Sequence, residues 1–244
     1  MFKKLVPLVY KTHQDFKLSP VEDFGFAGGF HVAALTVHEF MRAASIYPIV
    51  FLADGDSYRP VVLLGLKEQQ NLFVTSEGAW QASYIPASIR RYPFSLMSND
   101  TEGEFTICLD EQSQVFAGDS GEALFDADGE FSESFTKVTE MLRELQASDL
   151  LTTDFCERLQ KHDLFAPLKI GYQIDQDKHE LDGCFVINEQ AWNKLDEEAF
   201  EEFKKRGYLP AVYAQSISFG QVERLVELQR QLELTTNEPQ PAIH

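Results

Sequence analysis

The sequence has few cysteines, no long apolar run and, over one central stretch, no basic residue. Its 244 residues include three cysteines, Cys108, Cys156 and Cys184, which are widely spaced along the chain. A disulfide framework or a zinc site would need more thiols at closer spacing, so we expect buried free thiols and no metal. No apolar run approaches the roughly 18 residues that span a bilayer. We therefore expect no membrane insertion.

Basic residues are scarce in the second part of the chain. Residues 98–244 hold twelve lysines and arginines against thirty-one acids, and no base lies between Ser98 and Ser134. The net charge of the whole chain is −18. Such a surface repels nucleic acid and anionic lipid, and it favours a partner with a basic surface. The composition therefore predicts a protein or peptide partner and no nucleic acid.

Known catalytic and cofactor-binding signatures are also missing. The sequence contains no P-loop, no Gly-x-Ser-x-Gly, no Gly-x-Gly-x-x-Gly and no zincin motif. Residues 126–130, DADGE, fit neither register of a calcium-binding loop, and we interpret them as a solvated turn before a helix. We expect no cofactor, and the missing motifs favour a binding protein over an enzyme without deciding between them.

We expect no secretory signal in the first residues. Lys3 and Lys4 precede a short apolar piece that Pro7 and Lys11 interrupt, and no small-residue cleavage site follows. The expected location is the cytoplasm, with export by a route that uses no such signal left open.

What is present in the first half is a series of strand patterns with one helix pattern. Asp54-Gly55-Asp56 joins two β-rich runs and predicts a hairpin, since glycine supplies the positive φ of the turn. The remaining expected elements of this half are a helix or turn-helix over about 36–46 that Pro48 stops, a second hairpin over 70–85, and strands at 94–97 and 104–109 with a turn at 99–103.

The second half is dominated by helical periodicity. Apolar residues recur at 3.6-residue intervals over 131–165, where two helices fit, the first capped by Ser132 or Ser134 and the second by Thr152 or Thr153. The other expected elements are a β-hairpin near 168–188, a helix pair that ends at Gly207, and a last helix over 218–234.

These elements predict an α+β protein. We expect a mostly antiparallel sheet from the N-terminal half, with helices from 134–163 and 189–233 packed against it. The predicted organisation is a single domain over 1–233, with a β-rich part (1–131) and a helix-rich part (132–233), followed by a loose tail (234–244).

Two adjacent arginines, Arg90 and Arg91, stand out in the stretch SYIPASIRRYPFSLM, residues 83–97. One interpretation is that they pair with internal carboxylates and order the junction with the acidic segment. The other is an anion or carboxylate site, because guanidinium groups bind carboxylates in a bidentate manner. The residues predicted for that site are Arg42, Trp80, Tyr84, Arg90, Arg91 and Tyr92.

Alternation suggests that the two arginines differ in role. We expect one to be largely buried and paired with an acid from residues 100–130. The other is expected to reach a groove beside Trp80 and Tyr84.

Several blocks of the sequence resemble the SapC family of bacterial proteins. They are EFMRAASIYPIVF (39–51), VVLLGLKEQQNLFV (61–74), YIPASIRRYPF (84–94), ICLDE (107–111), GEALFDADGE (121–130), LDGCFVINEQAWNKLDEEAF (181–200) and AVYAQSISFGQVERL (211–225). The resemblance covers about residues 5–233. It supplies no catalytic residue set, because members of the family lack an established activity.

The resemblance implies a setting rather than a reaction. The family takes its name from a protein linked to a bacterial surface layer, and its members are often encoded near halogenase-like proteins, cupin-like proteins and outer-membrane receptors. The first hypothesis is therefore an accessory or binding protein that acts with a protein or peptide partner in a surface or nutrient-uptake system. The alternatives are an enzyme that acts on a peptide or small acid at the arginine-aromatic cluster, and a surface-layer component.

Overall fold

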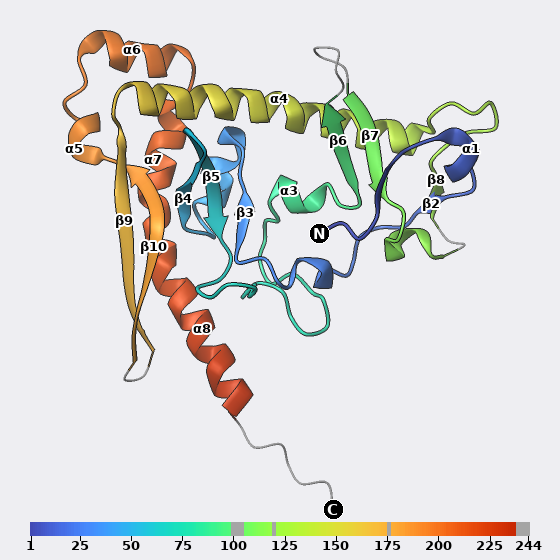
Figure 1. The fold of residues 1–244 in the computed structure, drawn as a ribbon, viewed down its shortest axis with the longest axis horizontal. Coiled ribbons are helices and arrows are strands. Elements are labelled where there is room, and N and C mark those ends of the chain that lie inside the picture. The colour runs from blue at the N-terminus through green and yellow to red at the C-terminus, as the bar shows by residue number, and fades with distance from the viewer. Residues whose placement is uncertain (99–104, 119–120, 175–176, 238–244) are drawn as a thin grey trace, which may run out of the picture.

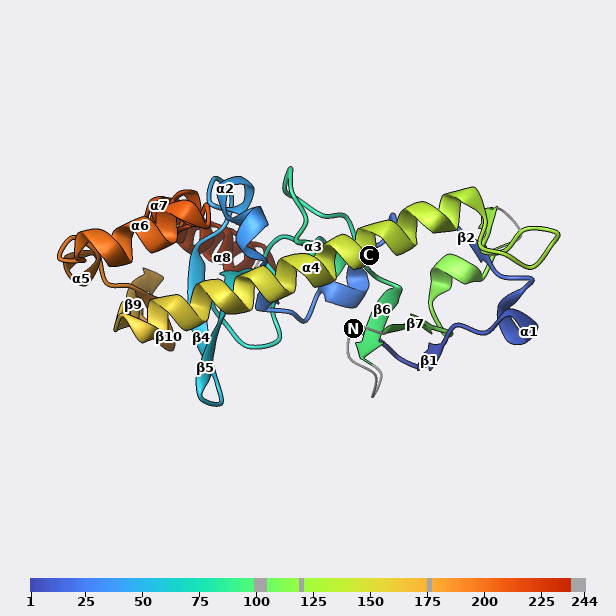
Figure 2. The ribbon, with the colours of Figure 1, turned by 90° about the horizontal axis from the view of Figure 1, so that it is seen from above.

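A single long helix, α4 (Glu133–Lys161), runs along the long axis of the molecule and contacts both of its β-sheet regions (Figures 1 and 2). The structure is a computed structural model that describes residues 1–98, 105–118, 121–174 and 177–237. The α+β prediction is confirmed, with antiparallel sheets mostly in the N-terminal half and helices mostly in the C-terminal half.

The larger sheet has five strands in the order β3-β5-β4-β10-β9, and every neighbouring pair is antiparallel. The hairpin predicted around Gly55 is confirmed, with Asp54 opposite Ser57 and Gly55 at φ +60°. The β-hairpin predicted near 168–188 is also present, and its first strand, β9, forms one edge of the sheet. The strands are β3 (Val32–Ala34), β4 (Ile49–Asp54), β5 (Ser57–Leu63), β9 (Phe165–Ile174) and β10 (Asp177–Ile187).

Two smaller sheets lie under the other end of α4 (Figure 1). The strands expected at 94–97 and 104–109 pair as predicted, and the turn expected at 99–103 lies outside the described residues. The three-stranded sheet has the order β1-β7-β6, and the two-stranded sheet pairs β2 with β8. Their bounds are β1 (Leu5–Pro7), β2 (Lys17–Leu18), β6 (Phe94–Ser98), β7 (Phe105–Asp110) and β8 (Glu122–Ala123).

Where two helices were expected in 131–165, the structure has α4 alone. Its N-cap is Ser132, one of the two predicted caps, whose hydroxyl accepts a hydrogen bond from the Phe135 amide at 3.2 Å. The predicted second caps lie inside the helix, because Thr152 and Thr153 donate their hydroxyl hydrogens to the carbonyls one turn back, at 2.6 and 3.1 Å. A hydroxyl satisfied in this way does not end a helix.

The helix or turn-helix expected over about 36–46 is present as a 3₁₀ turn (Val37–Glu39) followed by the short α2 (Phe40–Ala43). Two other local predictions need correction. Residues 70–85 form one isolated bridge, between Val74 and Trp80, instead of a hairpin. A further helix, α7 (Leu209–Ile217), begins with a proline at its second residue, a position at which proline fits a helix.

The remaining helices follow the sequence pattern more closely. Gly207 adopts φ +75° after α6, as expected for the residue that ends a helix. The last helix continues three residues beyond the predicted end at 234, and residues 238–244 lie outside the described part of the chain. The other bounds are α1 (Tyr10–His13), α3 (Ala87–Arg90), α5 (Glu189–Trp192), α6 (Glu197–Lys205), α8 (Gln221–Asn237), and the 3₁₀ turns Gly25–Ala27, Gln114–Phe116 and Ser218–Gly220.

The helix α4 contributes to two hydrophobic cores. Phe155 and Leu159, near its C-terminal end, belong to the larger core between the five-stranded sheet and the C-terminal helices. Phe135 and Leu142, near its N-terminal end, belong to the smaller core beneath the other sheets. Because one continuous helix supplies side chains to both cores, it fixes the position of the two β-sheet regions relative to each other.

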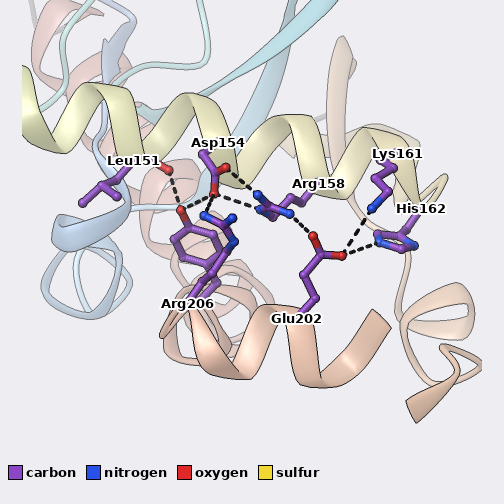
Figure 3. Close-up of polar contacts among 8 residues, drawn as sticks. Leu151, Asp154, Arg158, Lys161, His162, Glu202 and Arg206 are labelled. Carbon is purple, nitrogen blue, oxygen red and sulfur yellow. Dashed lines mark hydrogen bonds and ion pairs between the residues drawn. The ribbon is translucent and has the colours of Figure 1, made fainter. Parts of the chain in front are cut away.

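A polar network ties the C-terminal part of α4 to α6, as Figure 3 shows, and also includes the Tyr208 hydroxyl. The Asp154 carboxylate accepts two hydrogen bonds from Arg158, at 2.7 and 2.9 Å, and one from the Tyr208 hydroxyl at 2.7 Å. Arg206 adds a contact of 3.0 Å, and Arg158 forms an ion pair with Glu202. These contacts lower the pKa of Asp154 to about 2, chiefly through the hydrogen bonds from Arg158.

Candidate functional site

Two exposed arginines lie against the ring of one buried tyrosine. The guanidinium carbon of Arg42, in α2, is 4.7 Å from the centroid of the Tyr84 ring, and that of Arg90, at the end of α3, is 5.6 Å from it. A guanidinium within about 6 Å of an aromatic centroid is attracted by the ring quadrupole. The structure therefore brings together three of the residues predicted for the site.

Glu39 holds this arrangement in place. Its buried carboxylate accepts hydrogen bonds from the Tyr84 hydroxyl at 2.5 Å and from the Ala87 amide at 2.8 Å. Its other oxygen accepts from the amide and the hydroxyl of Thr36, both at 2.9 Å. One carboxylate thus links the turn before α2, the tyrosine ring and the first residue of α3. It thereby fixes the backbone from which both arginines project.

The Tyr84 phenol serves as a donor at this position. Burial, followed by the hydrogen bond to Glu39, raises the pKa of Tyr84 to about 12. The phenol is therefore neutral near pH 7, as a donor to a carboxylate must be. At neutral pH it has the properties of a positioning group and not those of a general base.

A second tyrosine connects Trp80 to the site. The buried Tyr47 hydroxyl donates to the Tyr84 carbonyl and accepts from the Trp80 indole nitrogen at 3.0 Å. Burial raises the pKa of Tyr47. The Tyr47 ring lies edge-on to Phe73 at 4.8 Å between centroids, and the guanidinium carbon of Arg224, in α8, lies 5.6 Å from the Phe73 ring. A third exposed arginine thus joins the same group of rings.

We call this group the arginine–aromatic surface. It comprises the exposed Arg42, Arg90 and Arg224 and the rings of Tyr47, Phe73, Trp80 and Tyr84. Within the described residues, none of its three arginines forms an ion pair. Four of the chain's nine arginines do pair with described carboxylates: Arg59, Arg158, Arg206 and Arg230.

Arg91 and Tyr92, also predicted for the site, lie apart from this surface. Tyr92 is buried, stacks on Phe26 at 4.0 Å between centroids, and donates a long hydrogen bond of 3.3 Å to Asp110. Arg91 lines cavities beside α4. Among the described residues the carboxylate whose charge acts on Arg91 is Asp149, so the expected partner from residues 100–130 is not the one found.

Four residues of the arrangement were not predicted from the sequence: Glu39, Tyr47, Phe73 and Arg224. For Glu39 a signal existed, because Thr36-x-x-Glu39 is the capping-box pattern, and the Glu39 side chain does accept from the Thr36 amide. Arg224 carries no comparable signal. It follows Glu223 in a helix whose charged residues resemble any solvated face, and only the packing of α8 places it over Phe73.

The cysteines and the possible metal ligands among the described residues do not form a second candidate site. All three cysteines are buried and free, and burial raises the pKa of the Cys156 thiol to about 12. The described residues contain no cluster of three or more histidine, cysteine, aspartate or glutamate side chains able to hold a metal ion. No helix in the same part of the chain is both long and apolar enough to cross a membrane.

Comparison with known protein families identifies a relationship that covers most of the chain. The family model SapC matches residues 8–225, which is most of the chain. No curated protein and no solved structure matches this sequence.

Proposed function

The chain belongs to the SapC family, and on that premise we propose that it is a binding protein that recognises an acidic group of a protein or peptide partner. The proposed contact is the arginine–aromatic surface. The setting is a bacterial surface or nutrient-uptake system, which is what the resemblance to the family implies. In this role the protein is an accessory to the system and does not carry out its chemistry.

The observation that carries the proposal is that Arg42, Arg90 and Arg224 are free of carboxylate partners within the described residues. The chain has 39 acidic residues, so internal partners for these arginines are abundant. Arg90 donates one hydrogen bond, from Nε to the Ile85 carbonyl at 2.9 Å. Exposed guanidinium groups that rest on rings and lack a carboxylate partner can bind carboxylates of another chain. Arginine on aromatic rings is also the composition typical of energetically important contacts.

The surface fits a macromolecular contact better than a reaction. Its arginines are exposed, and its two tyrosines keep their protons because burial raises their pKa values. The chain's net charge of −18 adds long-range attraction for a partner that is basic around the acidic contact group. Attraction of this kind weakens as salt is added, whereas the direct arginine contacts weaken less.

The test is site-specific photo-crosslinking in the native cell. A benzophenone amino acid replaces Met41, which is 63% exposed and adjacent to Arg42. We expect a discrete crosslinked adduct. The combined substitutions Arg42→Gln and Arg90→Gln should lower the yield of that adduct at least tenfold. The scale follows from the roughly 1.5–3 kcal/mol that a hydrogen bond to a charged group contributes.

The matched control is the pair Lys137→Gln and Arg143→Gln, which removes two exposed positive charges from α4 and should leave the adduct intact. An equal loss of adduct with both pairs of substitutions would show that net charge alone governs binding. An adduct unaffected by the substitutions at Arg42 and Arg90 would refute the proposed contact.

A further inference from the structure

Two cavities beside α4 meet at Arg91. One, of about 420 Å³, lies between the C-terminal half of α4 and the edge of the five-stranded sheet, and polar residues such as Asp149, Thr152 and Ser57 line it. The other, of about 450 Å³, lies beside the N-terminal half of α4 and is also lined by Arg91. We call the second one the apolar cavity. Both volumes fall in the range of about 300–1,000 Å³ that is usual for small-molecule sites.

The guanidinium of Arg91 has a donor without an acceptor. Its Nε atom is buried and has no hydrogen-bond partner in the described structure. Asp149 acts on Arg91 through its charge, but none of the ion pairs among the described residues includes Arg91. Burial lowers the pKa of Arg91, as expected for a cation removed from water. A buried donor left unpaired in this way costs free energy, and none of the described acceptors satisfies it.

The walls of the apolar cavity indicate what else the ligand must carry. They include Leu18, Val21, Pro93, Phe94, Val138 and Met141. Such walls favour an aliphatic or aromatic body, whose burial is favourable in proportion to the apolar area removed from water. The only described arginines at this cavity are Arg90 and Arg91, and Arg90 already lies against Tyr84.

The charge around Arg91 limits the ligand to a single negative charge. Glu122 lines the apolar cavity and Asp149 lines the neighbouring one, so a dianion such as a phosphate monoester would face nearby carboxylates. Burial raises the pKa of the Asp149 carboxyl, whereas the positive charge of Arg91 acts to lower it. A monocarboxylate satisfies the guanidinium without adding a second charge.

We infer that the apolar cavity binds an apolar monocarboxylate, whose body fills the cavity and whose carboxylate accepts from Arg91. This site adjoins the arginine–aromatic surface at Arg90, but the inference does not depend on the function proposed for that surface. The acid can be a free small molecule or the C-terminal residue of a peptide. Both present one carboxylate next to an apolar group.

The experiment measures binding to the full chain by titration calorimetry with defined probes. Octanoate and 4-phenylbutyrate represent free acids, and acetyl-Leu-Phe with a free C-terminus represents a peptide end. Octanamide and acetyl-Leu-Phe-amide are the neutral counterparts. We expect at least one acid to bind, and its neutral counterpart to bind at least tenfold more weakly. If the free acids bind more tightly than the peptide acid, the ligand is a small molecule, and the reverse order indicates a peptide C-terminus.

Two substitutions locate the site. Arg91→Gln should weaken the acid at least tenfold and leave the weak affinity for the neutral counterpart unchanged. Val138→Trp should abolish binding of both by filling the cavity. Arg143→Gln, an exposed change on the same helix, should have no effect.

Three results would overturn the inference: no acid binding at millimolar concentration, equal binding of acid and amide to the unmodified protein, or full acid binding by the Arg91→Gln variant. The first two are measured on the unmodified chain, so they stand even where a variant fails to fold.

Discussion

Replacement of Asp154 by asparagine should destabilise the protein by about 1–2 kcal/mol near neutral pH. The carboxylate holds α4 against the segment that carries Arg206 and Tyr208, and it accepts from three side chains (Figure 3). Its pKa falls from 3.8 to about 2 in the folded protein. At 1.36 kcal/mol per pKa unit this shift corresponds to an upper bound of about 2.5 kcal/mol. The 28% exposure of the side chain lowers that bound through solvent screening.

The pH dependence of this effect has a definite sign. A carboxylate whose folded pKa is depressed stabilises the protein above its unfolded pKa, and that contribution disappears as the pH falls through the folded value. The contribution of Asp154 should therefore be complete at pH 7, reduced by about half near pH 3, and largely lost by pH 2. The difference between the unmodified protein and Asp154→Asn should shrink over the same interval.

The assay is urea unfolding followed by circular dichroism at pH 7, 5 and 3. Glu227→Gln is the control, since Glu227 is 51% exposed and pairs with Arg230 within α8. That change should cost less than about 0.5 kcal/mol, as is usual for exposed pairs. The role assigned to the network would be refuted if Asp154→Asn lowered the free energy of unfolding by as little as Glu227→Gln does. It would also be refuted if a larger loss stayed constant from pH 7 to pH 3.

Two further predictions concern buried groups of the site and the cores. Tyr84→Phe removes a donor from the buried Glu39 carboxylate and should cost about 1–3 kcal/mol in urea unfolding, whereas Tyr213→Phe, at a half-exposed ring, should cost almost nothing. The three thiols, including Cys156 with its pKa raised to about 12, should resist a disulfide reagent at pH 8 and all react in urea. Rapid labelling of the native protein would contradict their burial.

The best sequence predictions were those in which local pattern and final environment agree. The alternation around Gly55 specifies a hairpin by itself, because the turn residue and the two flanking runs are adjacent in the chain. The same holds for the hairpin of β9 and β10 and for the cap at Ser132. Each depends on contacts between residues close in sequence, which composition and spacing can reveal.

The errors lie where packing overrides local preference. Thr152 suggests a helix start, but inside α4 its hydroxyl bonds to the Ser148 carbonyl and also accepts from the Val37 amide, 115 residues away. The aromatic run 70–85 has strand composition, yet Phe73 and Tyr84 pack into the larger core from an irregular loop. Aromatic side chains fit a core from either backbone, so their frequency does not decide between strand and loop.

The candidate site, like the fold, could be predicted from the sequence only in part. The sequence by itself determined the two hairpins, the helical second half, the buried thiols and a short set of arginines and aromatics from which a site could be built. Only the tertiary structure separated Arg90 from Arg91, placing one on the Tyr84 ring and the other between two cavities. It also brought Arg224 to Phe73 from 151 residues further along the chain. The physical reason is that a guanidinium finds its ring, carboxylate or cavity through side-chain contacts between distant segments, and those contacts exist only after the helices have packed.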